Sequence, residues 1–165
     1  MNGWVFVNKN KDKKELLVKY LENNLVELKN NEIYLDSCET IKDKIIYAKT
    51  FIHGFGKSNS KFIIAFLNCF DDKDILYLIK KQNQIIGCFT LRIKGKKSIY
   101  LYDFTILKEY RGNGYSRQVL NLIYHISLEW DKNKLFLYLK KNNEIGRNLY
   151  FSEGFLKYKY KKRIH

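Results

Sequence analysis

The sequence predicts one α/β domain whose central sheet is mixed and partly parallel. Its 165 residues are a usual length for a single domain, and 45% of them are hydrophobic, which is enough to bury a core. Three β-rich segments follow one another over 74–107, as in an antiparallel meander. From residue 114 onward helical and strand patterns alternate, which is typical of a sheet with parallel strands.

The first 73 residues are predicted to be mainly helical. Residues 4–7 are a short strand candidate, and apolar side chains at helical spacing predict a helix over 11–24. Residues 25–37 fit neither pattern. A helix is predicted over 40–56, which ends in a Gly-rich stretch, and another over 58–70, which begins with Ser and Asn cap candidates.

The second half is predicted to be rich in strands. The meander strands are 74–82, 84–93 and 98–107, joined by tight polar turns. The helical period returns over 114–130, and a buried type of strand follows at 135–139.

The end of the chain adds one more helix and one more strand. Residues 142–154 are predicted to be a helix that stops at Gly154. Residues 155–165 alternate apolar and basic side chains, which predicts a final strand with a frayed basic tail.

The net charge is +14, from 31 Lys and Arg against 17 Asp and Glu. Lys outnumbers Arg, Pro is absent, and Asn, Ile and Tyr are abundant, which is the codon bias of an AT-rich genome. We therefore expect the charge to be mainly a solvated surface and do not expect nucleic acid as a partner. The alternative is a nucleic-acid-binding protein that uses the basic and aromatic tail at 157–165.

The cysteines and the N-terminal sequence indicate in which cellular compartment the protein is expected. Cys38, Cys69 and Cys88 are odd in number and far apart, so neither a disulfide framework nor a zinc site is predicted. The histidines lack metal-ligand spacing, and we expect no metal. The sequence shows no signal-peptide core and no apolar run of ~20 residues. We expect a soluble, cytoplasmic protein in a reducing compartment, without a membrane partner.

The stretch EYRGNGYSRQVL, residues 109–120, joins a predicted strand to a predicted helix. The first N–H groups of a helix have no partner inside it, and the helix dipole favours negative charge there, so anions bind at this end. Gly112 and Gly114 allow positive φ and a close approach of a ligand, and Arg111 adds a fixed charge. An ordinary turn has the same composition, so the stretch alone leaves both interpretations open.

A second group of residues lies in NEIGRNLYFSEGF, residues 143–155. Asn143 directly follows a strand, and Gly146 and Tyr150 come three and seven residues later on the same helical face. A Tyr hydroxyl on the face of a small residue can point into a cleft. The alternative is that Tyr150 is an aromatic residue of the core or its rim.

Taken together, the two groups resemble the GCN5-related N-acetyltransferase (GNAT) superfamily. Arg111-x-x-Gly114-x-Ser116 is similar to that family's (Arg/Gln)-x-x-Gly-x-(Gly/Ala) pyrophosphate loop. Residues 143–155 are similar to its Asn-x-x-Ala-x-x-(Leu/Phe)-Tyr-x-x-x-Gly-Phe segment, and 84–87 resemble the opening of one of its strands. The resemblance covers about 74–158.

Three positions depart from the family pattern. Ser116 replaces Gly or Ala, Gly146 replaces Ala, and Lys108 stands where many members have Pro. None of these changes removes a donor. The resemblance implies a single acetyltransferase domain over 1–165, with an acetyl-CoA-binding core at 74–158 and a variable, acceptor-side part at 1–73.

The resemblance also implies helices on both faces of the sheet and a splayed pair of parallel strands, 98–107 and 135–139. Acetyl-CoA, as co-substrate, would lie between these strands. The resemblance assigns its pantetheine arm to the backbone near Thr105, Ile106 and Leu107, with Asn143 bonding that arm or a water. It assigns its pyrophosphate to the amides of Arg111, Gly112, Asn113, Gly114, Tyr115 and Ser116.

The reaction implied is direct attack of a primary amine on the acetyl group. Tyr150 would protonate the leaving thiolate, because a phenol with a pKa near 10 is a suitable acid for it. Asp103 is the best candidate for the base, because a carboxylate among aromatic residues is costly to bury. If Asp103 faces away, Tyr100 or Tyr102 would face the cleft, and water or a residue from 30–70 would be the base.

The sequence does not identify the acceptor, which we expect to be a small-molecule, peptide or protein amine. Asp71, Asp72 and Asp74 either attract a cationic acceptor or form a solvated turn, while the positive net charge slightly favours neutral or peptide acceptors. We expect a monomer or a homodimer. A family fold that binds acyl-CoA without turnover is the remaining alternative.

Overall fold

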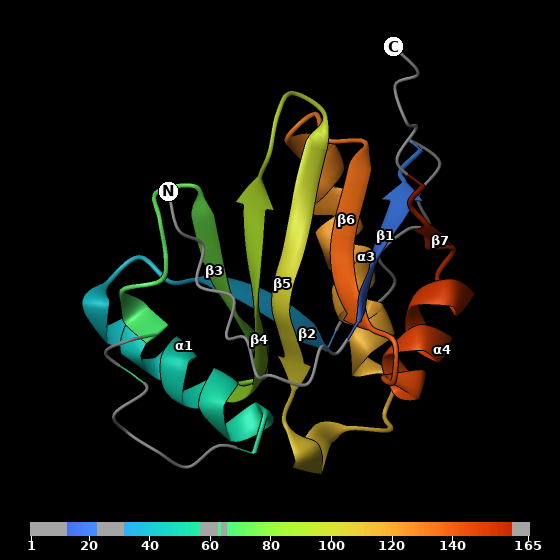
Figure 1. Cartoon of the computed structure of the whole chain (residues 1–165). Helices are drawn as coiled ribbons and strands as arrows, with labels where there is room; N and C mark the ends of the chain where they lie inside the picture. The colour runs from blue at the N-terminus through green and yellow to red at the C-terminus, as the bar shows by residue number, and fades with distance from the viewer. Residues whose placement is uncertain (1–12, 23–31, 57–62, 64–65, 160–165) are drawn as a thin grey trace.

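The structure is a computed structural model that describes residues 13–22, 32–56, 63 and 66–159. Its seven strands form one open sheet in the order β2-β3-β4-β5-β6-β1-β7 (Figure 1). Neighbouring strands are antiparallel except for the parallel pair β5–β6. The elements are β1 (Lys14–Tyr20), β2 (Ile33–Ser37), α1 (Ile41–Gly54), β3 (Asp74–Lys81), β4 (Gln84–Ile93), β5 (Ser98–Ile106), a 3-10 helix (Lys108–Tyr110), α3 (Tyr115–Glu129), β6 (Lys134–Lys140), α4 (Glu144–Ser152) and β7 (Leu156–Lys157). The predicted mixed α/β sheet is confirmed.

The meander β3-β4-β5 and the helices that follow it lie where the sequence predicts them. The two hairpin turns contain left-handed residues, Gln82 with φ 53° and Gly95 with φ 78°. Helix α1, also predicted, begins with a capping box in which the Thr40 hydroxyl and the Asp43 side chain each accept a backbone N–H. Local sequence signals therefore determine most of these elements.

The predicted helix over 11–24 is wrong. Residues 14–20 are strand β1, which pairs along its whole length with β6 and at two positions with β7. Leu16, Leu17 and Val18 are all buried, because a strand inside a sheet has apolar neighbours on both faces. A continuous apolar run of this kind fits a helical period by coincidence, and its length of seven residues is typical of a strand.

Other segments are shorter than predicted or lie outside the described residues. The end of the unassigned stretch 25–37 is strand β2. The final strand contains only Leu156 and Lys157. The strand candidate 4–7 and the tail beyond 159 lie outside the described residues, as does most of the helix predicted over 58–70, of which residues 63, 66 and 67 are helical.

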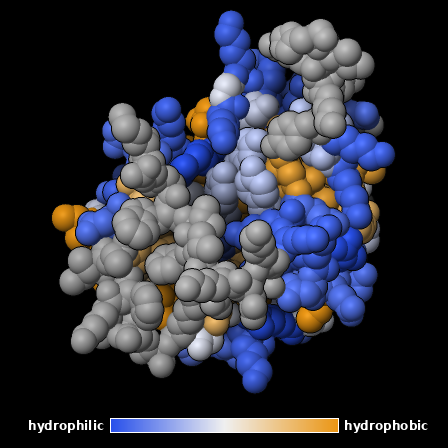
Figure 2. Space-filling model, viewed as in Figure 1, coloured by the Kyte–Doolittle hydropathy of each residue, from blue (hydrophilic) through white to orange (hydrophobic). Residues whose placement is uncertain are grey.

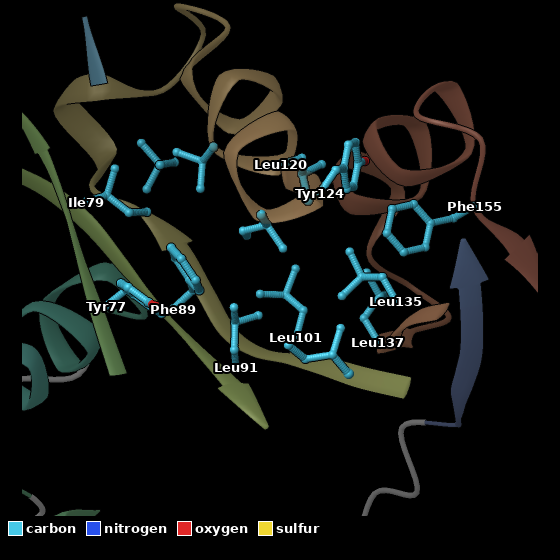
Figure 3. Packing of buried hydrophobic residues seen from close by; sticks show 14 of the residues in the cluster. Tyr77, Ile79, Phe89, Leu91, Leu101, Leu120, Tyr124, Leu135, Leu137 and Phe155 are labelled. Atoms are coloured by element: carbon cyan, nitrogen blue, oxygen red, sulfur yellow. The ribbon is translucent and has the colours of Figure 1, made fainter. Parts of the chain in front are cut away.

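Helices cover both faces of the sheet, as predicted. Helix α1 packs Tyr47 against Leu76, Leu78 and Cys88 on one face. Helix α3, helix α4 and Phe155, which lies between α4 and β7, cover the other face, where the largest cluster of buried side chains lies (Figure 3). Its members in Figure 3 include Tyr77, Ile79, Phe89, Leu91, Leu101, Leu120, Tyr124, Leu135, Leu137 and Phe155. Because side chains alternate along β3 and β4, each of these strands contributes apolar residues to the core on both faces of the sheet.

The parallel pair β5–β6 separates along its length. Its pairing runs from Ser98 opposite Lys134 to Leu101 opposite Leu137, although β5 continues to Ile106 and β6 to Lys140. Figure 1 shows the two strands diverging toward the end from which the chain leads into the 3-10 helix and α3. The predicted splayed pair is confirmed, and the edge of β5 beyond Leu101 has no β6 partner.

Candidate active site

The chain leaves β5 at this split and forms a loop before α3. Gly112 has φ 82°, and Gly114, the N-cap of α3, has φ 76°, both in the left-handed region that favours glycine. Within the described part of the chain, the N–H groups of residues 112–116 donate to no acceptor, whereas Arg117 and Gln118 already bond to the Gly114 carbonyl. The loop thus presents a row of free donors at a helix N-terminus, which suits a phosphate.

Two side chains of this loop maintain its shape. The Arg111 guanidinium donates to the Ile106 carbonyl (2.8 Å) and to the Gly54 carbonyl (2.8 Å), so it ties the loop to the ends of β5 and α1. The Asn113 amide donates to the carbonyls of Tyr110 and Arg111 at 3.2 Å each. Two of the five N–H donors of the Arg111 guanidinium thus hold backbone carbonyls, and its fixed positive charge stays at the loop. The backbone amides of residues 112–116 add further donors for an anion.

The helix that follows is anchored at its first turn. The Tyr115 hydroxyl accepts a hydrogen bond from Lys81, whose ammonium also lies 4.9 Å from the centre of the Tyr115 ring. Ser116 is half-buried beside it. Arg117 pairs with Glu153 at 3.1 Å and so connects α3 to the end of α4. These contacts fix the loop relative to its neighbours.

Thr105, Ile106 and Leu107, the predicted pantetheine segment, are buried at the end of β5. The Leu107 N–H donates to the Ile86 carbonyl at 2.8 Å, which keeps β5 close to β4. A Cβ on Gly87 would lie 2.2 Å from the Thr105 carbonyl oxygen, so this close approach requires glycine. The glycine of the 84–87 motif thus holds the edge of β5 in place.

Asp103 lies on a β-bulge of β5. Thr90 pairs with Tyr102 and Cys88 pairs with Thr105, so two residues of β5 oppose one of β4, and Asp103 has φ 56°. The Thr90 hydroxyl donates to the Asp103 carboxylate at 3.4 Å. The bulge therefore turns Tyr102 and Asp103 to the same face, that of α1. In a regular strand adjacent side chains point to opposite faces, so the sequence predicted that only one of the two would face the cleft. The sequence gives no signal for the bulge.

The environment of Asp103 changes its acidity. Burial raises the pKa of this carboxyl from 3.8 to about 6, and the Thr90 hydrogen bond opposes the rise. The Tyr47 hydroxyl lies 2.7 Å from the Thr90 oxygen, and both side chains are buried. A chain of three groups thus orients the carboxylate. Sequence reasoning missed Tyr47 and Thr90, although Thr90 is the polar residue in the most buried stretch of β4.

Tyr150 lies on α4, over the opposite face of the sheet. Its ring packs edge-on against Phe155 at 5.4 Å, and among the described residues its hydroxyl forms no hydrogen bond. Burial raises the pKa of Tyr150 well above its ordinary value. A phenol with a raised pKa keeps its proton until a strong base forms beside it. The candidate acid and the candidate base therefore lie on the two faces of the sheet.

Asn143 is the N-cap of α4. Its side-chain oxygen accepts the Gly146 N–H at 2.9 Å. A Cβ on Gly146 would lie 2.7 Å from the Asn143 Nδ2 atom, so the glycine that replaces the family's alanine makes room for the cap. Asn143 keeps its NH2 group as a donor, and its contact with a pantetheine arm stays a prediction.

The described residues contain no group of three or more His, Cys, Asp or Glu side chains arranged to hold a metal ion. No helix among them is both long and apolar enough to cross a membrane.

The sheet is open and has one split parallel pair, and β5 leads through a Gly-rich loop into α3. The model of the acetyltransferase (GNAT) family matches residues 44–155. The chain therefore belongs to the acetyltransferase (GNAT) family. No curated protein matches the sequence.

Solved structures show the same fold at low identity. A functionally unknown conserved protein from Staphylococcus epidermidis has a TM-score of 0.65 and 12% identity over 88% of this chain and 57% of its own. A GNAT family acetyltransferase from Elizabethkingia anophelis with acetyl-CoA bound has a TM-score of 0.57 and 17% identity over 76% of each chain. AAC(6')-Iy, in complex with a CoA-S-monomethyl-acetylneamine bisubstrate analogue, has a TM-score of 0.61 and 11% identity over 79% of this chain and 98% of its own. The chain thus spans just over half the length of the first of these proteins.

Proposed function

We propose that the protein is an acetyl-CoA-dependent N-acetyltransferase that acetylates a primary amine by direct attack. One observation carries the proposal: at the end where β5 and β6 separate, the backbone N–H groups of residues 112–116 have no acceptor among the described residues. Family membership supports it, as does the acetyl-CoA bound to the E. anophelis structure. The identity of the amine is a separate question.

The residues at the split fit acetyl-CoA. The 112–116 amides suit its pyrophosphate, since backbone donors and the α3 dipole both favour an anion. The unpaired edge of β5 beyond Leu101 suits the amides of the pantetheine arm, which can pair as a strand would. When bound, acetyl-CoA supplies an acetyl group activated as a thioester.

The side chains move two protons. An ammonium has no free electron pair, so Asp103 accepts a proton from the amine, and a pKa of about 6 leaves the carboxylate ionised near neutral pH. As the N–C bond forms and the C–S bond breaks, the nitrogen loses its second proton to water, and Tyr150 donates its proton to the sulfur. The products are an amide and a thiol, and both residues recover their protonation states by exchange with water.

The first test is thermal unfolding with and without acetyl-CoA. A ligand at 100 times its dissociation constant adds about 2.7 kcal/mol, which raises the midpoint by roughly 5–10 °C. Gly114→Ala and Gly95→Ala form a matched pair, because both glycines have positive φ (76° and 78°) and open space around a Cβ. We expect both to lower the midpoint, and Gly114→Ala alone to reduce the shift with acetyl-CoA.

Two results would count against the proposal. An unchanged midpoint with acetyl-CoA would mean that the loop is an ordinary turn. Binding without release of free thiol, for every amine tried, would instead support a fold that holds acyl-CoA without turnover.

A further inference from the structure

Five aromatic rings gather on the face of the sheet to which Asp103 points. This aromatic face consists of Tyr100, Tyr102, Phe136, Tyr138 and Tyr158. Tyr100 stacks on Phe136 at 4.9 Å and on Tyr102 at 6.0 Å, with planes within about 16° of each other, and lies 6.3 Å from Tyr138. Tyr158 meets Phe136 edge-on at 5.2 Å. The rings thus form one continuous surface across β5 and β6.

The aromatic face is partly accessible and adjoins the candidate base. Tyr138 is 45% exposed, and Tyr100, Tyr102 and Tyr158 are half-buried. Figure 2 shows weakly hydrophilic side chains over β5 and β6, next to strongly hydrophilic ones. Tyr102 directly precedes Asp103, and the bulge turns both to this face. An amine held at Asp103 therefore has aromatic rings beside it.

The charges around these rings are mainly positive. The Lys94 ammonium lies 4.9 Å from the centre of the Tyr100 ring, and the Arg92 guanidinium 5.7 Å from that of Tyr102. Arg92 binds Asp74 through two hydrogen bonds and lies 3.5 Å from Asp71. Two of the three acids that could attract a cationic acceptor are therefore neutralised. Within the described part of the chain, Lys94 forms no ion pair.

We infer that the acceptor is a primary amine that carries both an aromatic ring and an acidic group, an inference that rests on the proposed function. An aromatic ring can stack on the tyrosines, and an acidic group can pair with Lys94. A polycation such as a polyamine meets Lys94 and the positive net charge instead. An aliphatic amino acid can pair with Lys94 but has no ring to stack on the tyrosines.

Four amines separate these features, with thiol release from acetyl-CoA as the readout. Phenylalanine has both the ring and the carboxylate, phenethylamine lacks the carboxylate, leucine lacks the ring, and spermidine is a polycation. We expect kcat/KM for phenylalanine to exceed that of each of the others by about tenfold or more. Equal or faster turnover of leucine or spermidine, or no turnover of phenylalanine, would overturn the inference.

A matched pair of variants tests the acidic group. Lys94 and Lys96 are both exposed residues of the same hairpin, but only Lys94 lies over a ring of the aromatic face. We expect Lys94→Gln to lower kcat/KM several-fold for phenylalanine and to leave phenethylamine unchanged, while Lys96→Gln changes neither. An equal effect of both variants would overturn the inference. The thermal shift with acetyl-CoA, measured on the same samples, reports separately on the proposed function.

Discussion

Replacing Asp103 by Asn should stabilise the fold at neutral and higher pH while it removes activity. The folded protein raises the pKa of this carboxyl from 3.8 to about 6, so the ionised form costs the fold about 3 kcal/mol. Asn is uncharged, keeps an oxygen for the Thr90 hydroxyl, and tolerates the left-handed φ of 56° as Asp does. The substitution thus removes the carboxylate charge and keeps the backbone conformation and the Thr90 hydrogen bond.

The pH dependence of the effect can be worked out. Between pH 3.8 and about 6 the unfolded chain loses this proton while the folded chain keeps it, so wild-type stability falls through that window as pH rises. The cost is about 1 kcal/mol at pH 4.5 and about 3 kcal/mol at pH 8. Asp103→Asn should therefore gain about 2 kcal/mol over wild type between these two pH values, or roughly 4–8 °C in midpoint.

Thermal or urea unfolding of both proteins at a series of pH values measures this difference, and thiol release measures activity. We expect kcat/KM to fall by roughly 10²–10⁴, the usual contribution of a general base. Asp131→Asn is the control, because Asp131 has φ 55° but is exposed and paired with Lys97, which lowers its pKa. A stability difference for Asp103→Asn that does not change with pH would refute the reasoning.

Three further substitutions test the other groups of the site. Thr90→Val removes the hydroxyl that lowers the pKa of the base, so the acid limb of the kcat/KM–pH profile should move up by roughly 0.5–1 pH unit; an unmoved limb would exclude this role. Tyr150→Phe should lower kcat by roughly 10²–10⁴ and keep the thermal shift with acetyl-CoA, whereas full activity would rule out its role as the acid. Gly146→Ala should not give the fold the ~1 kcal/mol of stability that helix propensity predicts, because the new Cβ would meet the Asn143 cap. In an Asn143→Ala background the same change should stabilise the fold. Unfolding titrations of the double-mutant cycle test this difference.

The fold could be predicted largely because its elements carry local signals. The meander, α3, β6 and α4 each have a periodicity and a turn or cap that the sequence shows directly. Strand β1 has neither, since its apolar run reflects two buried faces that exist only once β6 and β7 lie beside it. Its secondary structure is set by tertiary neighbours, which the period of a single segment cannot report.

The candidate site divides in the same way. The loop at 112–116 could be predicted, because its proposed function depends on backbone N–H groups that any Gly-rich strand–helix turn leaves free. The partners of Arg111 and Asp103 could not. Arg111 binds a carbonyl 57 residues away, and Asp103 depends on Thr90, which is 13 residues away and opposite a bulge. Such contacts depend on the register of the strands, and one inserted residue changes it.

The bulge explains why Asp103 is better interpreted as a functional residue than as a surface acid. It places a non-glycine residue at positive φ, and it half-buries a carboxylate that the weak Thr90 hydrogen bond holds. Both features disfavour folding, and neither improves the packing of the sheet around it. A regular strand with an apolar residue at this position would avoid both costs. It would also turn the side chain after Tyr102 to the opposite face, away from the aromatic face where we propose that the acceptor binds.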